Sequence, residues 1–154
     1  MNFIVFLTLA LLIHVCQAQT PEDFLAPHNA ARAEVNVAPL VWNETVATYA
    51  RNYANQLTGD CTLVPSGGPY SENLALGSGA LSTSDVEQLW LGQKSNYDYQ
   101  SNSCQGGAEN CVQYINVVCR NSLYLGCAIA TCNNGNTIVA CNYYPPCVVG
   151  ERPY

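Results

Sequence analysis

Three stretches of the chain repeat apolar residues at the three- and four-residue spacing of an α-helix. The first, residues 20–35, begins with a threonine cap, a proline and two acids, and we expect this helix to bend or restart at Pro27. The second begins at Asn43, and its predicted core face comprises Val46, Tyr49, Ala50, Tyr53, Ala54 and Leu57. The third is capped by Thr83 or Ser84, and its shared face comprises Val86, Leu89, Trp90 and Gln93.

Between the second and third predicted helices, glycine and proline cluster at residues 65–69 and 77–79, which leaves residues 71–75 as a short helical turn at most. After Cys104 the pattern of residues changes. Three later stretches are rich in Val, Ile, Tyr and Cys and are predicted to be strands: residues 114–119, 123–131 and 137–144. The last two flank Asn133-Asn134-Gly135-Asn136, which is typical of a hairpin turn. Helices followed by an antiparallel sheet indicate an α+β fold.

A separate apolar segment precedes these elements. Residues 3–15 are almost wholly apolar but too few to span a bilayer, and Cys16-Gln17-Ala18 suits a signal peptidase. We therefore predict a signal peptide at residues 1–18 and one domain at residues 19–154. No second apolar run follows, so we expect no membrane anchor in the mature chain.

The net charge of the chain restricts the kinds of partner that it can bind. Five basic and eleven acidic residues give a net charge of −6, and all of them follow residue 18. A negative chain does not attract phosphate backbones or anionic lipid headgroups, so we expect no nucleic-acid partner. Any lipid must be held by shape and apolar contact, and we expect the protein to act as a monomer.

Eight cysteines remain after residue 18. An even number behind a signal peptide indicates disulfides, because the secretory path is oxidising. A zinc site is the alternative, but the cysteine gaps are irregular and only one histidine remains. Spacing alone leaves 105 pairings open. Asn43-Glu44-Thr45 is also a glycosylation acceptor, whose other interpretation is a plain helix cap.

Many short segments of the chain, in order, resemble the plant pathogenesis-related class 1 proteins. They are residues 28–33, 59–61, 66–75, 89–90, 97–104, 120–122, 125–127, 132–135, 141–143 and 152–154. These proteins belong to the CAP superfamily, with the cysteine-rich secretory and antigen 5 proteins. The resemblance implies an α-β-α sandwich and three disulfides, namely Cys61–Cys132, Cys104–Cys111 and Cys127–Cys141. The arms of the predicted hairpin independently favour the last pair.

Two further cysteines depart from the family pattern. Cys119 stands where the family has Trp, and Cys147 stands where it has Gly. A fourth bridge, Cys119–Cys147, is the simplest interpretation, and two free thiols are the alternative. A catalytic Cys119 with His28 is disfavoured, because the flanking signature of papain-like enzymes is missing.

The resemblance also implies a cleft of two His and two Glu. His28 stands at the first His, Glu72 at the first Glu, Gln93 at the second Glu and Gln113 at the second His. Glutamine neither titrates nor coordinates metal well, so we predict no metal, no cofactor and no catalytic residue. We interpret His28 and Glu72 as a hydrogen-bonded pair lining a polar pocket.

Two family properties bear on partners. Residues 52–61 match a sterol-contact segment of the family, so Tyr53 is a candidate contact for a sterol or another apolar lipid. The alternative interpretation is that Tyr53 is a core residue of the helix. Residues 145–154 resemble a stretch that is proposed to be released as a signalling peptide, which would imply a receptor.

Together these features predict a non-enzymatic, secreted plant defence protein, extracellular (apoplastic) or vacuolar, with antifungal action through sterol. The rivals are a hydrolase or protease using His28 and Glu72, and a paralogue without cleft function.

Overall fold

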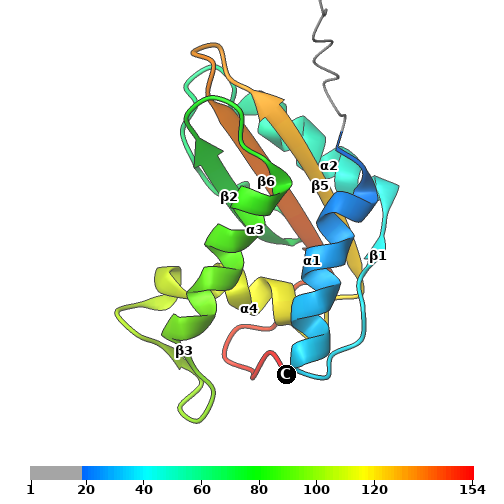
Figure 1. Ribbon diagram of the computed structural model, residues 1–154, viewed down its shortest axis with the longest axis vertical. Coiled ribbons are helices and arrows are strands. Elements are labelled where there is room, and N and C mark those ends of the chain that lie inside the picture. Colours follow the sequence, from blue (N-terminus) through cyan, green and yellow to red (C-terminus); the bar gives the residue numbers. More distant parts are fainter. Residues whose placement is uncertain (1–18) are drawn as a thin grey trace, which may run out of the picture.

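Helices and strands alternate irregularly along the chain, as the computed structural model in Figure 1 shows. The structure describes residues 19–154, so the predicted signal peptide lies outside the described residues. The longer elements are α1 (Pro21–Glu34), α2 (Glu44–Gln56), β2 (Ser71–Gly77), α3 (Thr83–Gly92), α4 (Val112–Val118), β5 (Tyr124–Thr131) and β6 (Thr137–Tyr144). The shorter ones are β1 (Val41–Trp42), η1 (Gln93–Asn96), β3 (Tyr97–Asp98), β4 (Ser103–Cys104) and η2 (Ala108–Asn110).

The main sheet has the strand order β1-β5-β6-β2. β5 and β6 form the predicted hairpin, whose register places Thr131 opposite Thr137 and Cys127 opposite Cys141. Gly135 turns the chain between them with φ of +84°, a conformation that costs glycine little. β2 pairs antiparallel with β6, and the short β1 pairs parallel with β5.

The helix starts follow local capping rules. α1 begins with a reciprocal pair of bonds between Thr20 and Asp23, and Asn43 caps α2 by accepting from two backbone N–H groups. The cap of α3 is Ser82, one or two residues before the predicted Thr83 or Ser84, because Ser82 and Asp85 form the capping box. α1 continues through Pro27 as one helix, so the helix does not restart there.

Two predicted elements are wrong. Residues 71–75 are part of strand β2, which pairs with β6 from Ser71 to Gly77. Residues 114–118 belong to helix α4, and its buried side chains Tyr114, Val117 and Val118 recur at helical spacing. Their high strand propensity is overridden because α4 packs against α1 and α3.

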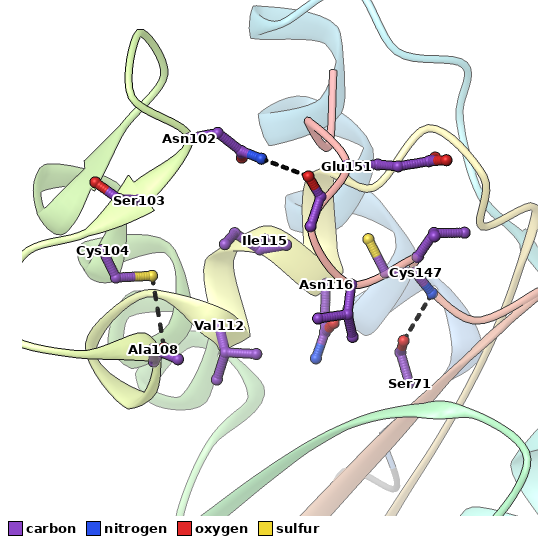
Figure 2. A pocket seen from close by; sticks show the side chains of 13 residues that line it. Ser71, Asn102, Ser103, Cys104, Ala108, Val112, Ile115, Asn116, Cys147 and Glu151 are labelled. Carbon is purple, nitrogen blue, oxygen red and sulfur yellow. Dashed lines mark hydrogen bonds between the residues drawn. The ribbon is translucent and has the colours of Figure 1, made fainter.

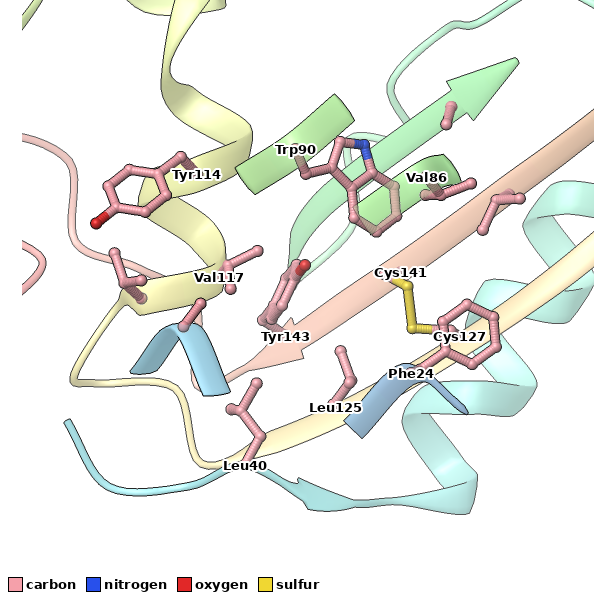
Figure 3. Packing of buried hydrophobic residues seen from close by; sticks show 14 residues of the cluster. Phe24, Leu40, Val86, Trp90, Tyr114, Val117, Leu125, Cys127, Cys141 and Tyr143 are labelled. Carbon is pink, nitrogen blue, oxygen red and sulfur yellow. A yellow bond between two sulfur atoms is a disulfide. The ribbon is translucent and has the colours of Figure 1, made fainter. Parts of the chain in front are cut away.

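The sheet lies between two helical layers, which confirms the α+β class and the α-β-α sandwich. Helix α2 covers one face, and α1, α3 and α4 lie on the other (Figure 1). The larger apolar cluster lies under α1, α3 and α4 and includes Trp90, Tyr143 and Leu125 (Figure 3). A smaller, alanine-rich cluster lies under α2. β6 is buried on both faces, which fits its continuous apolar run at residues 138–141.

All four predicted disulfides are present. Cys127–Cys141 crosses the hairpin inside the larger cluster (Figure 3), and Cys61–Cys132 joins the segment after α2 to the residue after β5. Cys104–Cys111 closes a short loop, and Cys119–Cys147 ties the C-terminal segment to the residue after α4. Among residues 19–154, no helix is long and apolar enough to cross a membrane.

Candidate functional site

Strand β2 presents Glu72 to a surface cavity of about 480 Å³. The two carboxylate oxygens accept from the backbone N–H of Ser66 at 2.9 Å and from the side-chain amide of Asn142 at 3.4 Å. The loop at residues 65–68, Tyr70 and Gln113 line the same cavity. Glu72 is half-buried and anchored by two donors, and the cavity that it faces is also lined by Leu63, Leu74, Val112 and a second acid, Glu109.

Gln93 and Gln113 bond to each other, as two amides can. The Gln93 amide donates to the Gln113 side-chain oxygen at 2.8 Å, and the Gln113 backbone N–H donates to the Gln93 side-chain oxygen at 3.1 Å. The Gln113 amide then donates to the Leu74 carbonyl of β2 at 2.8 Å. The pair therefore joins the start of η1 to α4 and to the sheet, and its polar atoms are occupied.

His28 does not line this cleft, and the predicted His28–Glu72 pair is wrong. Its side chain is fully buried between α1, α3 and β6. Nδ1 lies 2.8 Å from the Phe24 carbonyl oxygen and 2.9 Å from a Glu87 carboxylate oxygen, and Nε2 lies 2.9 Å from the Tyr143 hydroxyl. Because α1 turns this face toward the sheet, both ring nitrogens are engaged away from Glu72.

Buried amides and a tyrosine, which sequence reasoning missed, connect His28 to the cleft. Asn73 donates to the Tyr143 hydroxyl at 2.9 Å and to the Gln113 carbonyl at 2.9 Å, and Asn116 donates to the Asn73 side-chain oxygen at 2.9 Å. Burial raises the pKa of Tyr143 well above its ordinary value, so the hydroxyl keeps its proton. The signal available in the sequence was strand alternation, which points Asn73 away from Glu72.

The cleft residues do not assemble a metal site. Across residues 19–154, no group of three or more His, Cys, Asp or Glu side chains lies close enough to hold a metal ion. Glu72 has two amides near it in place of the ligands that zinc prefers. The residues present are suited to hydrogen bonding with a neutral polar group.

The other two candidate residues lie on or beside α2. Tyr53 is half-buried rather than part of the core, and its hydroxyl donates to the Val64 carbonyl. Val64 and its neighbour Leu63 are 53% and 42% exposed. Asn43 accepts from the backbone N–H groups of Thr45 and Val46 at 2.9 and 3.2 Å, which is the capping role. Glycan occupancy at Asn43 stays a prediction.

A second cavity of about 590 Å³ lies where the C-terminal segment meets α4 and β4 (Figure 2). Val112 and Ile115 of α4 form one wall, and Cys147 with Val148 forms the other. Ser71 of β2 holds this segment by accepting from the Cys147 backbone N–H at 2.8 Å. No candidate site had been predicted here.

This sandwich of helices on a disulfide-linked sheet, with a half-buried acid on β2, defines a class of cysteine-rich domains. The model of the "CAP: Cysteine-rich secretory protein family" matches residues 25–143, and the chain belongs to this family. The resemblance to the plant class 1 proteins is confirmed. The basic form of pathogenesis-related protein 1 of Nicotiana tabacum is 49% identical over 97% of this chain and 84% of the relative. Pathogenesis-related protein 1 of Arabidopsis thaliana is 49% identical over 98% and 94%.

Solved structures share the fold at lower identity. A hookworm platelet inhibitor is 22% identical, has a TM-score of 0.72, and is matched over 92% of this chain and 81% of that one. At this identity the likeness concerns the fold alone.

Proposed function

We propose that this protein is a secreted plant defence protein of the pathogenesis-related 1 type, acting without catalysis. The observation that carries the proposal is 49% identity over 98% of the chain to a plant pathogenesis-related protein 1. Four disulfides support secretion, because such bonds form and persist outside the cytosol. Because the net charge of the chain is −6, we expect partners that are recognised by their shape and not anionic partners held by charge.

The cleft supports the non-enzymatic part of the proposal. The rival hydrolase would use Glu72 and His28 together, so both side chains would have to reach one substrate in the cleft. The two donors to Glu72 are a backbone N–H and an amide. Gln113 and a second acid, Glu109, line the same cavity, and neither is hydrogen-bonded to Glu72. His28, the histidine that the rival hydrolase would use, is engaged in the core by Tyr143 and Glu87.

Growth inhibition of a plant-pathogenic oomycete by the purified, disulfide-bonded protein tests the defence role. We expect inhibition that the Glu72→Gln variant retains, since the acid does no chemistry. Retained growth in the presence of wild-type protein would refute the role. Inhibition that Glu72→Gln abolishes, together with hydrolysis of an ester or peptide substrate, would support the enzyme instead.

Sterol binding is the finer proposal for how the protein acts. The exposed pair Leu63 and Val64 lies beside Tyr53, whose hydroxyl fixes the Val64 carbonyl, and Leu63 borders the Glu72 cavity. A rigid apolar ligand with one hydroxyl would match an apolar rim next to a polar cleft. Radiolabelled sterol should bind the wild type and bind the Tyr53→Ala and Leu63→Ser variants at least tenfold more weakly. Tyr124→Ala, a partly exposed tyrosine on β5, is the control and should not change binding; equal binding by all variants would exclude this surface.

Release of residues 145–154 as a signalling peptide for a receptor is a further part of the proposal. The segment follows β6 directly, and its first residue, Pro145, is half-buried. Synthetic peptide 145–154 should induce defence genes in leaves at submicromolar concentration, whereas a scrambled peptide should not. Equal responses to the two peptides would remove this part of the proposal.

A further inference from the structure

The C-terminal segment, residues 145–154, is joined to the body at two points. One is the backbone that continues from β6. The other is the disulfide between Cys147 and Cys119, which lie 28 residues apart in sequence and whose Cα atoms are 5.8 Å apart. A backbone cut between Tyr144 and Cys147 therefore opens a loop without freeing the segment, because Cys147 stays bonded to Cys119.

The two cysteines differ in exposure. Cys119 is 1% exposed and lies at the end of α4, whereas Cys147 is half-buried. Cys147 also lines the cavity of about 590 Å³ in Figure 2, opposite Val112 and Ile115. Thiol exchange requires a thiolate to reach a sulfur atom, so a small thiol has access from this cavity to Cys147 and not to Cys119.

Weaker contacts also hold the segment. Arg152 donates to the carbonyls of Tyr99 and Gln100 at 3.1 and 3.0 Å, and the Tyr154 ring stacks on Tyr99. Asn102 donates to the Gly150 carbonyl at 2.9 Å. These three hydrogen bonds are exposed and exchange readily with water. Pro153 is buried and accepts from the Arg120 backbone N–H at 2.6 Å, and Tyr154 packs against the larger cluster. The freedom that a separated peptide gains opposes all of these contacts, so they hold the segment more weakly than a covalent bond does.

We propose that Cys119–Cys147 is a thiol-exchange site that retains the C-terminal segment after proteolysis between Tyr144 and Cys147, and that a low-molecular-weight thiol of the glutathione class releases it. The reductant thiolate bonds to the Cys147 sulfur, and Cys119 leaves as a thiolate and takes up a proton. A second reductant thiolate attacks the mixed disulfide at the reductant's own sulfur, and Cys147 leaves as a thiolate that is protonated. Two electrons and two protons thus pass to the protein, and the reductant becomes its own disulfide.

The Cys119–Cys147 bridge would control the release of the C-terminal peptide. A role of this bridge in signalling therefore rests on the peptide release that is part of the proposed function. Attachment of the segment is a separate physical property that needs no receptor and no defence assay. The test below measures attachment alone, so a negative result here leaves the defence role untouched, and the reverse also holds.

The test uses a chain with one lysine. Lys94 is the sole lysine of the sequence, and Arg at this position keeps a cation opposite Glu34. Pro146 is exposed and lies in irregular backbone directly before Cys147. In the Lys94→Arg/Pro146→Lys variant, a lysine-specific endopeptidase cuts at the 146–147 bond alone. Size-exclusion chromatography at about 10 μM followed by mass spectrometry then locates the fragment 147–154.

Without reductant, we expect nearly all of the fragment to co-elute with the body. With 10 mM reduced glutathione, alkylation should tag both Cys119 and Cys147, and the co-eluting fragment should fall at least tenfold. The matched control adds Cys119→Ser and Cys147→Ser to the same variant. It should lose the fragment on cutting, with or without glutathione.

Three results would overturn the proposal. The first is loss of the fragment from the disulfide-bonded protein before any reduction. The second is a fragment that stays with the body after both cysteines are tagged. The third is cutting of the serine control alone, because the bridge would then shield the backbone rather than retain the product. If the serine control does not fold, the reduced and non-reduced samples of the disulfide-bonded protein decide the question.

Discussion

Arg32 shows how much structure one side chain can hold. It is fully buried, and its guanidinium donates to the carbonyls of Ala38, Val117, Cys119 and Ser122 at 2.7–2.9 Å. In the described part of the chain, no carboxylate lies within 4.0 Å of it. Burial lowers the pKa of Arg32 to about 10, so the group is still a cation at neutral pH. Its planar fork thereby joins the segment after α1, the end of α4 and the approach to β5.

Arg32→Lys should destabilise the protein by about 3 kcal/mol. A lysine ammonium has three N–H groups on a flexible side chain, so it would leave some of the four buried carbonyls without a donor. Urea unfolding followed by circular dichroism measures the change. Arg51→Lys is the matched control: Arg51 is exposed and pairs with Glu44 on the surface, so we expect a change within about 0.5 kcal/mol. Equal losses in the two variants would show that the four carbonyls are not what Arg32 stabilises.

The role of His28 could not be inferred from its matching position in a family. The resemblance places His28 in the cleft, although the spacing of neighbouring residues favours the core. Phe24, His28 and Ala31 follow at steps of four and three, and all three are buried. The positions of Glu72 and Gln113 on one cavity were predictable from the resemblance. The partners of His28 were not, because Glu87 and Tyr143 come from distant elements that only the tertiary fold brings together.

At the scale of elements, sequence prediction succeeded where the signal is local. Caps and apolar spacing located α1, α2 and α3, and the Asn-Gly turn located the β5–β6 hairpin. β2 was missed because its seven residues are ordered by pairing with β6, which begins more than 60 positions later. α4 was missed because its β-branched residues have strand propensity that packing overrides.

Helix α2 can lie this close to the sheet only because β5 has a glycine beneath it. A Cβ at Gly126 would lie 2.0 Å from the backbone nitrogen of Ala47, so α2 would have to move. Gly126→Ala should therefore cost about 3 kcal/mol by overpacking. Gly59→Ala is the control, since a Cβ there meets nothing within 4 Å. Thermal unfolding compares the two, and a Gly126→Ala midpoint as high as that of Gly59→Ala would contradict the close contact.

The stability that the capping box of α3 contributes to the protein should depend on pH. Bonds from the Ser82 hydroxyl and backbone N–H lower the pKa of Asp85 below its ordinary 3.8. A depressed carboxyl pKa gives stability that is complete above the unfolded pKa and is lost as pH falls through the folded one. Asp85→Ala should thus be less stable than wild type at pH 7, and the gap should close below about pH 3.8.

Chemical unfolding at pH 7 and at pH 2.5 measures that gap. Ser84→Ala, which changes the same exposed turn without removing a titrating group, is the matched control. Its difference from wild type should be the same at both pH values. A gap for Asp85→Ala that persists at pH 2.5 would assign the stabilisation to a source other than the ionised carboxylate.

For the whole molecule, the disulfides restrict the unfolded chain unequally. Cys61–Cys132 spans 71 residues, whereas Cys104–Cys111 spans 7. By the loop-entropy model the longer bridge contributes about 4 kcal/mol and the shorter about 2.5 kcal/mol. We expect the Cys61→Ala/Cys132→Ala variant to unfold at a lower guanidinium concentration than Cys104→Ala/Cys111→Ala. The reverse order would indicate that native packing around the bridges, rather than loop length, sets their contribution.

The amides of the cleft have a consequence for solubility. Gln113 and Asn116 of α4 donate to the carbonyls of Leu74 and Glu72, which are alternate residues along β2, the last strand of the sheet. Unpaired carbonyls on such a border strand are a template for the strand of another molecule. Because α4 supplies side-chain donors to them, a second chain finds few free acceptors there. The same groups that shape the cleft thus guard the sheet against intermolecular strand addition and the fibrous aggregates that it starts.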